Sequence, residues 1–199
     1  ADGEDFPLAD VFENLARILS VTDLPVTIDM ESGYGADPAA VGASVGRAKA
    51  AGAAGINMED RLPGESALLP VAEAVARYRA AADTGIFVNA RCDTFRGADV
   101  AKDGAALVAA TLERARAYAD AGAGSLFVPF LLDPKSIGAI CEGSPLPVNI
   151  LRGKGGPTHR ELAALGVARI SHGHQPWAGA MAWLAAQTAQ VLGGEEPDY

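Results

Sequence analysis

The sequence predicts an α/β protein built like a (β/α)8 TIM-type barrel. Short apolar runs with β-forming residues alternate along the chain with longer segments that carry apolar residues at helical spacing. Polar side chains stand where most of the short runs end. Repeated β–α units with almost continuously apolar strands indicate a parallel sheet that is covered by helices.

Six runs are expected to be strands, and each is preceded or followed by turn-forming residues. They span residues 25–29, 55–59, 86–91, 125–129, 147–151 and 168–172. Small-residue, glycine-containing hinges precede the runs at 55, 125 and 168. Such hinges are typical of a helix that ends on glycine and turns into the next buried strand.

Seven segments between and around these runs are expected to be helices. They span residues 8–20, 38–51, 69–82, 103–121, 134–141, 158–165 and 176–192. Asp37 and Asp133 each precede a proline, which predicts a helix N-cap followed by proline in the first turn, and Thr158 is a further predicted cap. We expect residues 1–199 to form one domain, with residues 176–199 as a C-terminal helix and tail.

Six strands fit either an open doubly wound sheet or a barrel that lacks its first two β/α units. Asp29, Glu59, Arg91, Asn149 and His172 each stand at the carboxyl end of a different expected strand. In a barrel these ends converge on one mouth, where active sites are built. An open sheet would favour a glycine-rich phosphate loop after its first strand, and this sequence has none there. The pattern therefore favours the N-terminally incomplete barrel.

Composition narrows the choice of partners and location. The net charge of −9 argues against a nucleic-acid groove and against an anionic membrane surface. No run approaches the roughly 18 apolar residues of a membrane span, and no signal-peptide pattern opens the sequence, so a cytoplasmic location is expected. Cys92 and Cys141 are far apart, match no metal-binding or redox spacing, and are expected to be reduced.

A cluster of carboxylates predicts a metal site. Adjacent parallel strands would bring Asp29 and Glu31 next to Glu59. Three oxygen donors suit a hard cation, Mg²⁺ or Mn²⁺, better than zinc. Because Mg²⁺ usually keeps several waters, we expect one direct carboxylate ligand and others that act through water.

Arg91 closes the strand after Glu59 and has two interpretations. An arginine beside a metal-loaded acid cluster is suited to hold a substrate carboxylate through two hydrogen bonds. Alternatively, Arg91 neutralises Glu59 or Asp93 within a structural ion network. The neighbouring metal cluster favours the functional interpretation.

Four motifs, in this order, resemble the isocitrate lyase/phosphoenolpyruvate mutase superfamily. They are "PVTIDMESGYG" (25–35), "AGAAGINMEDR" (51–61), "NARCDTF" (89–95) and "LPVNIL" (146–151). The resemblance covers essentially the whole chain. It implies a Mg²⁺-dependent (β/α)8 enzyme that acts on a small 2-oxo acid or a related carboxylate.

The resemblance also implies a role for each matching residue. Asp29 would be the direct metal ligand, with Glu31 and Glu59 holding metal-bound waters. Arg91 would bind the substrate carboxylate or the developing enolate, and Asn149 would line the pocket.

Further residues complete the implied site. Asp2, 27 residues before Asp29, corresponds to a fourth acid near the metal. Gly33 and Tyr34 are expected to contact the substrate. His174 is the expected acid/base, with His172 and Tyr34 as alternatives.

The reaction itself stays open, because the segment after Glu59 departs from the patterns of both named activities. It lacks the cysteine-bearing segment of isocitrate and methylisocitrate lyases and the longer gating loop of phosphonomutases. We expect a lyase that cleaves or forms a C–C or C–P bond through a metal-stabilised enolate. The alternatives are a phosphonomutase, a phosphonopyruvate hydrolase, a decarboxylase, a ketopantoate hydroxymethyltransferase-like enzyme and a non-catalytic oxo-acid-binding barrel.

The last expected helix predicts an oligomer. It carries Met181, Trp183 and Leu184, which indicate either core packing or a subunit interface. The resemblance implies that this helix is exchanged between protomers. We therefore expect a homo-oligomer, a dimer or a tetramer.

Overall fold

The computed structural model describes residues 3–199 and contains one six-stranded sheet. Its strands are β1 (Thr27–Asp29), β2 (Gly55–Glu59), β3 (Phe87–Arg91), β4 (Ser125–Val128), β5 (Val148–Leu151) and β6 (Arg169–Ser171). They lie in chain order, and every neighbouring pair is parallel. Each parallel step needs a crossover connection, which a helix usually provides. The predicted parallel α/β class is confirmed.

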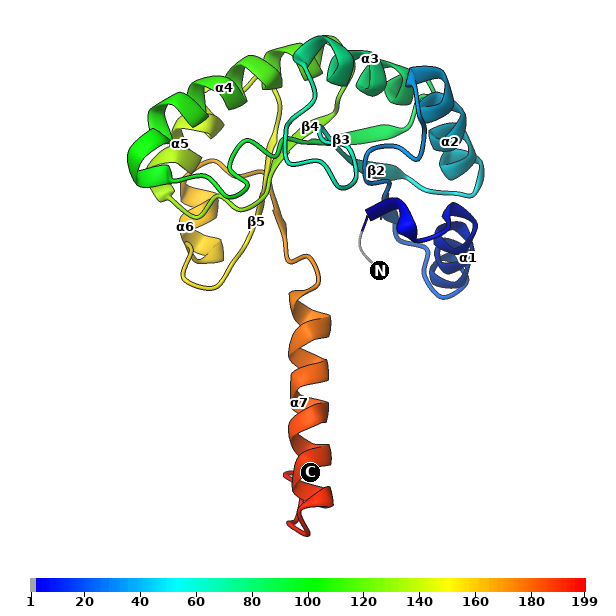
Figure 1. Ribbon diagram of the computed structural model, residues 1–199, viewed down its shortest axis with the longest axis vertical. Coiled ribbons are helices and arrows are strands. Elements are labelled where there is room, and N and C mark those ends of the chain that lie inside the picture. The colour runs from blue at the N-terminus through cyan, green and yellow to red at the C-terminus, as the bar shows by residue number, and fades with distance from the viewer. Residues whose placement is uncertain (1–2) are drawn as a thin grey trace.

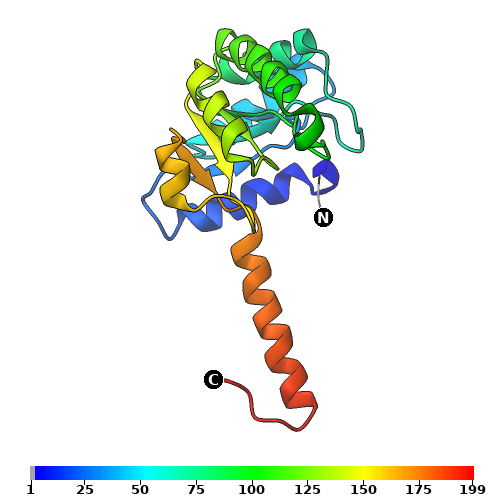
Figure 2. The same ribbon diagram turned by 90° about the vertical axis from the view of Figure 1, so that its left-hand side faces the viewer.

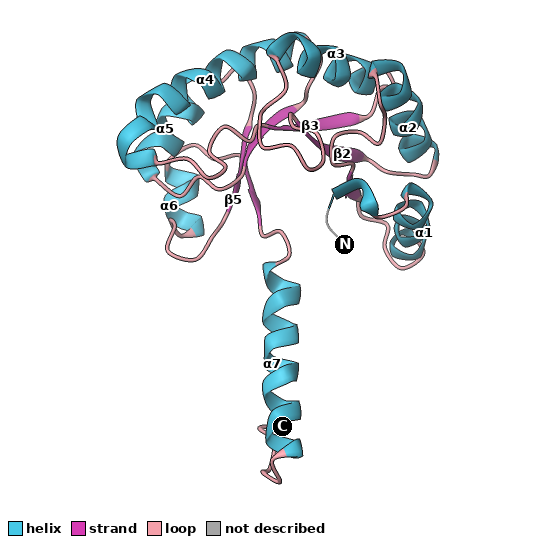
Figure 3. Cartoon of the chain, in the orientation of Figure 1, coloured by secondary structure: helices cyan, strands magenta, loops and turns pink. Residues whose placement is uncertain are grey.

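Helices form the outer layer of the curved sheet (Figure 1). They are α1 (Leu8–Leu19), α2 (Pro38–Ala50), α3 (Val71–Ala82), α4 (Val100–Asp120), α5 (Pro134–Gly143), α6 (His159–Ala164) and α7 (Gln175–Leu192), preceded by the 3-10 turn η1 (Gly3–Asp5). Figure 3 shows α2 to α6 along the convex side and the strands inside the curve. The helices cover the convex side of the sheet, and loops follow the carboxyl ends of the strands.

Side-chain caps fix where several helices begin. Asp37 accepts a hydrogen bond from the Ala40 amide at 2.8 Å, and Asp133 accepts one from Ser136 at 2.8 Å. Thr158 forms a capping box with the third residue of α6. Helix α4 begins at Val100 rather than at the expected residue 103, because Asp99 caps the amides that follow it.

The sheet curls until its two edges approach each other. The Arg169 guanidinium on β6 lies 3.4 Å from the Thr27 hydroxyl on β1, although these strands stand at opposite ends of the strand order. The described residues thus form a parallel half-barrel with six strands. The expectation of two absent β/α units goes beyond what these strands establish.

The core between sheet and helices is apolar and closely packed. Ile56, Met58 and Val88 on the strands are almost wholly buried. Two buried tyrosines from the helices, Tyr78 and Tyr118, have ring centroids 4.5 Å apart. The Tyr78 hydroxyl lies 3.0 Å from the Met58 carbonyl oxygen and 2.8 Å from that of Arg91. This contact ties the ends of β2 and β3 together.

A row of polar side chains crosses three adjacent strands at one level of the sheet. Asn57, Asn89 and Ser125 are register partners on β2, β3 and β4. Asn89 donates to Asn57 at 2.7 Å, and Ser125 donates to Asn89 at 2.6 Å. These bonds satisfy polar groups that would otherwise be costly to bury.

Helix α7 extends away from the half-barrel (Figures 1 and 2). Trp177, Trp183 and Leu184 are at least half exposed on it. The C-terminal tail folds back along the helix, where the Asp198 amide donates to Gln187 at 2.6 Å. Among the helices of residues 3–199, none has both the length and the apolarity needed to cross a membrane.

Candidate active site

A cavity of about 960 Å³ lies at the carboxyl ends of the strands. Its walls come from the strand ends and the loops that follow them: Asp29, Glu31, Asn57, Glu59, Arg61, Pro63, Gly64, Arg91, Arg96, Phe127, Pro129, Phe130, Leu151, Arg169, Ile170, Ser171, His172, Gly173 and His174. The four residues of the expected acid–arginine cluster (Asp29, Glu31, Glu59 and Arg91) all belong to this wall. The convergence expected from a barrel mouth is therefore present.

The turn after β1 presents two acids to the cavity. Glu31 has a left-handed backbone (φ 46°), and its amide donates to the Asp29 carboxylate at 3.0 Å. The Glu31 carbonyl accepts from the Glu59 amide at 2.7 Å, which fixes this turn against the end of β2. Backbone hydrogen bonds thus hold three carboxylate-bearing residues beside one another.

Glu59 is a buried carboxylate, with its side chain only 5 % exposed. Its Oε2 lies 2.7 Å from Arg91 Nη1. Burial raises the pKa of Glu59 to about 7, while Arg91 opposes that rise and Asp93 adds to it. Without a further cation nearby, Glu59 therefore holds its negative charge only weakly at neutral pH.

Arg91 is held by carboxylates on two sides. Its Nε and Nη2 donate to the two oxygens of Asp93 at 2.7 and 2.8 Å, and its Nη1 pairs with Glu59. Burial lowers the pKa of Arg91, but the hydrogen bonds and charge of Asp93 outweigh this effect and raise the pKa. The ion network considered as an alternative role is present. It also fixes the guanidinium at the cavity wall.

A second network lies behind the wall and anchors it. Asp60 is fully buried and accepts from the Asp93 amide at 2.9 Å, from the Tyr118 hydroxyl at 2.6 Å and from Arg114 at 3.2 Å. Burial raises the pKa of Asp60, and these hydrogen bonds act against that rise. Helix α4 thereby positions the loop that carries Asp93.

The donor chemistry of the acid cluster fits hydrated Mg²⁺. The wall supplies carboxylate oxygens from Asp29, Glu31 and Glu59, which are the ligands that hard cations prefer. Within residues 3–199, no three His, Cys, Asp or Glu side chains lie close enough together to hold an ion directly. Glu59 is also already paired with Arg91. The division into one direct carboxylate ligand and others that act through water remains a prediction.

The remaining predicted site residues lie in different places. His174 and His172 line the cavity, and His172 Nε2 lies 3.3 Å from His159 Nε2. Asn149 does not stand at the carboxyl end of its strand, as expected, but is the second residue of β5; it is fully buried, is not among the residues that line the cavity, and accepts from Ser171 at 3.1 Å. Cys92 is buried, as expected for a packing residue. Asp2 lies outside the described residues.

Tyr34 lines a second hollow of about 530 Å³, and neither Gly33 nor Tyr34 lines the main cavity. Gly33 has φ 108°, and a side chain there would meet Val41 at 2.8 Å, so glycine is needed for packing. The Tyr34 amide donates to Glu4 at 2.8 Å, and burial raises the pKa of the Tyr34 hydroxyl. Their expected contact with substrate remains a prediction.

Much of the wall was not anticipated, including three arginines and Phe130. Arg61 lies two positions after Glu59, so strand alternation alone would have placed it on the same face. Arg169 begins β6, whereas the sequence interpretation considered only the strand ends. Arg96 and Phe130 belong to loops in which alternation no longer applies. The directions of the Arg96 and Phe130 side chains depend on tertiary contacts, which a local sequence pattern does not predict.

The family model described as phosphoenolpyruvate phosphomutase matches residues 1–192. The chain belongs to this family. Membership of the wider isocitrate lyase/phosphoenolpyruvate mutase superfamily, expected from the four motifs, is thereby confirmed.

This chain is similar to several proteins, of which three are described. A solved structure of a Burkholderia cenocepacia J2315 protein proposed to be a phosphonomutase is 48% identical, has a TM-score of 0.91, and matches 94% of this chain and 77% of that one. An uncharacterized protein of Mycobacterium tuberculosis is 34% identical over 92% of this chain and 67% of its own length. An oxaloacetate decarboxylase of Bradyrhizobium sp. (strain BTAi1) is 28% identical over 96% of this chain and 67% of its own length. The chain thus spans about two thirds of these two curated relatives.

Proposed function

We propose that this family member takes part in a Mg²⁺-dependent reaction on a small 2-oxo acid or related carboxylate, in which a bond beside the carbonyl carbon is cleaved or formed. The observation that carries the proposal is the polarised cavity. Asp29 and Glu31 lie on its β1 side, and Arg91 lies at the end of β3. A cation site beside a fixed guanidinium matches the carboxylate charge and the carbonyl oxygen that a 2-oxo acid presents to a protein.

Five residues of the wall have a role in this proposal. Asp29 would hold Mg²⁺ directly, and Glu31 and Glu59 would hold it through water. The bound ion would supply positive charge where negative charge develops on the substrate. Arg91, fixed by Asp93, would orient the substrate carboxylate. A ring nitrogen of His174 would exchange a proton with the reacting carbon.

Turnover of a substrate panel tests the proposal. Oxaloacetate, phosphonopyruvate, 2-methylisocitrate and a 4-hydroxy-2-oxo acid would each be incubated with Mg²⁺ or with EDTA and followed by proton NMR. We expect turnover of at least one compound that stops in EDTA and in an Asp29→Asn variant. Turnover that survives EDTA would contradict the metal's role.

A phosphonomutase-type or phosphonopyruvate hydrolase-type reaction is the second candidate. It is favoured by the 48% identity to the Burkholderia protein proposed to be a phosphonomutase. Phosphorus NMR of phosphonopyruvate distinguishes the two candidates, because it reports cleavage or transfer at the C–P bond directly. Binding of the panel without any turnover would instead support the non-catalytic barrel, for which the lack of the lyase cysteine segment speaks.

We further propose a homo-oligomer in which α7 packs against another copy. Its exposed face carries Trp177 and Trp183, and such contiguous apolar surface is usually covered. Sedimentation equilibrium at micromolar concentration should show a dimer or tetramer, and a monomer would contradict the proposal. A cytoplasmic location remains a prediction of the sequence.

A further inference from the structure

The arginines of the main cavity differ in how firmly they are held. The buried Asp93 carboxylate is paired by Arg91 at 2.7 Å, by Arg61 at 3.4 Å and by Arg96 at 3.6 Å. Arg61 also approaches Glu59 at 3.5 Å and donates to the Glu65 carbonyl at 2.6 Å. Arg96 has the longest of these three contacts with Asp93, and its side chain is 45% exposed.

Arg96 is nevertheless kept over the cavity by an aromatic ring. Its guanidinium carbon lies 5.4 Å from the centroid of Phe130, and that of Arg91 lies 5.8 Å from the same centroid. Stacking uses the face of a guanidinium and leaves its N–H groups in the plane to donate hydrogen bonds. Arg96 is therefore able to stack on Phe130 and bind an anion at the same time.

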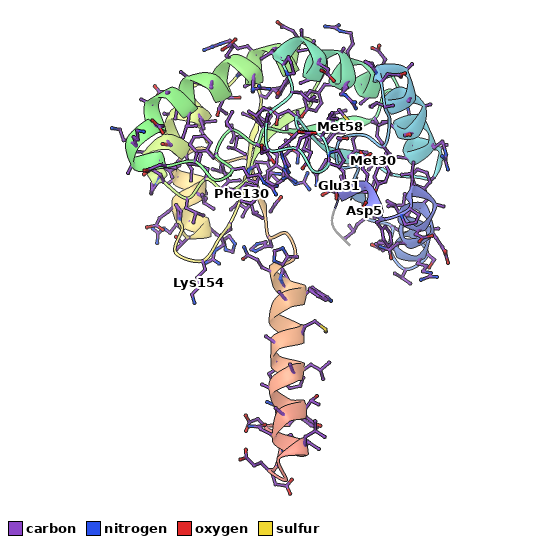
Figure 4. The ribbon with its side chains drawn as sticks, in the orientation of Figure 1. Asp5, Met30, Glu31, Met58, Phe130 and Lys154 are labelled. Carbon is purple, nitrogen blue, oxygen red and sulfur yellow. The ribbon has the colours of Figure 1, made fainter. Side chains whose placement is uncertain are left out.

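Phe130 itself is held in an unusual conformation. Its φ of 65° lies in the left-handed region, which bulky residues rarely adopt. Strained backbone of this kind persists where the surroundings impose it, and it concentrates at functional sites. Figure 4 shows Phe130 and Glu31 as separate side chains within the arch of the half-barrel. Phe130 lies near Arg91 and Arg96 in the cavity wall, apart from Glu31.

We propose that the Arg96–Phe130 pair is a specificity-determining subsite for a second anionic group on the substrate, a carboxylate or a phosphonate. This inference rests on the 2-oxo acid function proposed above. Arg91 would orient the first carboxylate. Arg96 would exchange its 3.6 Å contact with Asp93 for the second group. Asp93 would remain neutralised, because Arg91 still binds it through two hydrogen bonds.

Paired ligands test this subsite by affinity rather than by activity. Calorimetry in the presence of Mg²⁺ would compare 3,3-difluorooxaloacetate and phosphonopyruvate with 2-oxobutyrate, a 2-oxo acid without a second anionic group. The wild type should bind at least one dianion about tenfold or more tightly than 2-oxobutyrate, the range of a hydrogen bond between charged groups. The two dianions distinguish a carboxylate from a phosphonate as the second group.

Variants locate the effect. Arg96→Met should lose about tenfold in dianion affinity and keep its affinity for 2-oxobutyrate, and Arg96→Lys should recover part of the loss. Arg169→Met removes another arginine of the same wall and serves as the matched control, with the preference for dianions unchanged. Thermal melting verifies that each variant is folded.

Three outcomes would overturn the inference. An unchanged dianion preference in Arg96→Met would remove Arg96 from the subsite. An equal loss in Arg169→Met would assign the preference to the overall charge of the cavity. Equal wild-type binding of all three ligands would refute the subsite and leave the 2-oxo acid function standing, whereas no binding at all would refute both.

Discussion

Glu59 and Asp60 are consecutive buried carboxylates at the end of β2, and they serve opposite purposes. Asp60 turns toward the helices, where Tyr118, Arg114 and a backbone amide satisfy it. Glu59 turns toward the cavity and is paired with Arg91, and its pKa is raised to about 7. Strand alternation thus assigns one acid to the framework and the next to the site. The two roles predict different changes in the free energy of unfolding when each acid is replaced.

The largest expected effect is that of Asp60→Ala. It leaves the Arg114 charge in a site where that side chain is only 12% exposed, and loss of one partner from a buried pair costs about 3–5 kcal/mol. Urea unfolding measures the change. Asp60→Asn is the matched control and should lose less, because the amide oxygen still accepts from the Asp93 amide. A loss below about 1 kcal/mol in Asp60→Ala would show that the framework role is wrong.

Glu59 should make the metal-free protein less stable as the pH rises. Its folded-state pKa of about 7 exceeds its ordinary value of 4.5, so the stabilisation is complete below pH 4.5 and is lost as the pH rises through about 7. The loss reaches up to about 3 kcal/mol. Urea unfolding in EDTA at pH 5 and pH 8 should show this slope. Glu59→Gln should remove most of it, and an identical slope in that variant would contradict the pKa.

The N-cap of α6 is remote from Glu59 and Asp60, and it shows how much an ordinary local interaction contributes to the free energy of unfolding. Thr158 caps α6, and the Glu161 carboxylate accepts a hydrogen bond from the Thr158 amide at 2.7 Å. Thr158→Ala should cost about 1 kcal/mol without pH dependence between 5 and 8. Thr158→Ser keeps the hydroxyl and should restore most of the loss in the same unfolding experiment. Equal losses in both variants would show that the hydroxyl is not what stabilises the helix.

The smallest expected effect on stability belongs to Asp29→Asn, which should still remove the metal. The amide oxygen continues to accept from the Glu31 amide, and loss of one charge relieves repulsion within the acid cluster. The unfolding free energy should change by less than about 0.5 kcal/mol. Calorimetry should show that Mg²⁺ affinity is lost. Unchanged affinity together with a lower melting temperature would refute the metal site.

Sequence patterns predicted the strands well, because most strand ends are marked twice. An apolar run stops, and a polar residue such as Asp29 or Arg91 follows at the same point. The caps Asp37 and Asp133 were also readable, since each precedes a proline. The start of α4 was not, because the glycine and aspartate before Val100 look like a loop until Asp99 is seen to cap the helix.

The site was predicted only as far as the strands reach. Glu59 and Arg91 end regular strands, so alternation fixes their direction. Asn149 was expected at a strand end, but it is the second residue of β5, and its side chain accepts a hydrogen bond from the wall residue Ser171 without lining the cavity itself. Phe130 and Arg96 depend on a left-handed backbone and on ring stacking, and neither is marked by a local sequence period. Loop geometry, rather than strand pattern, therefore accounts for what the sequence did not reveal.

The polar row across β2, β3 and β4 has a direction. The Ser125 hydroxyl donates to the carbonyl oxygen of Asn89, and the amide nitrogen of Asn89 donates to the carbonyl oxygen of Asn57. Asn57 is also part of the cavity wall, and its oxygen is held within the sheet by this bond. None of the bonds in the row uses the NH2 group of Asn57. The interior of the sheet thereby orients Asn57 so that this NH2 group is a hydrogen-bond donor suited to an oxygen of a ligand.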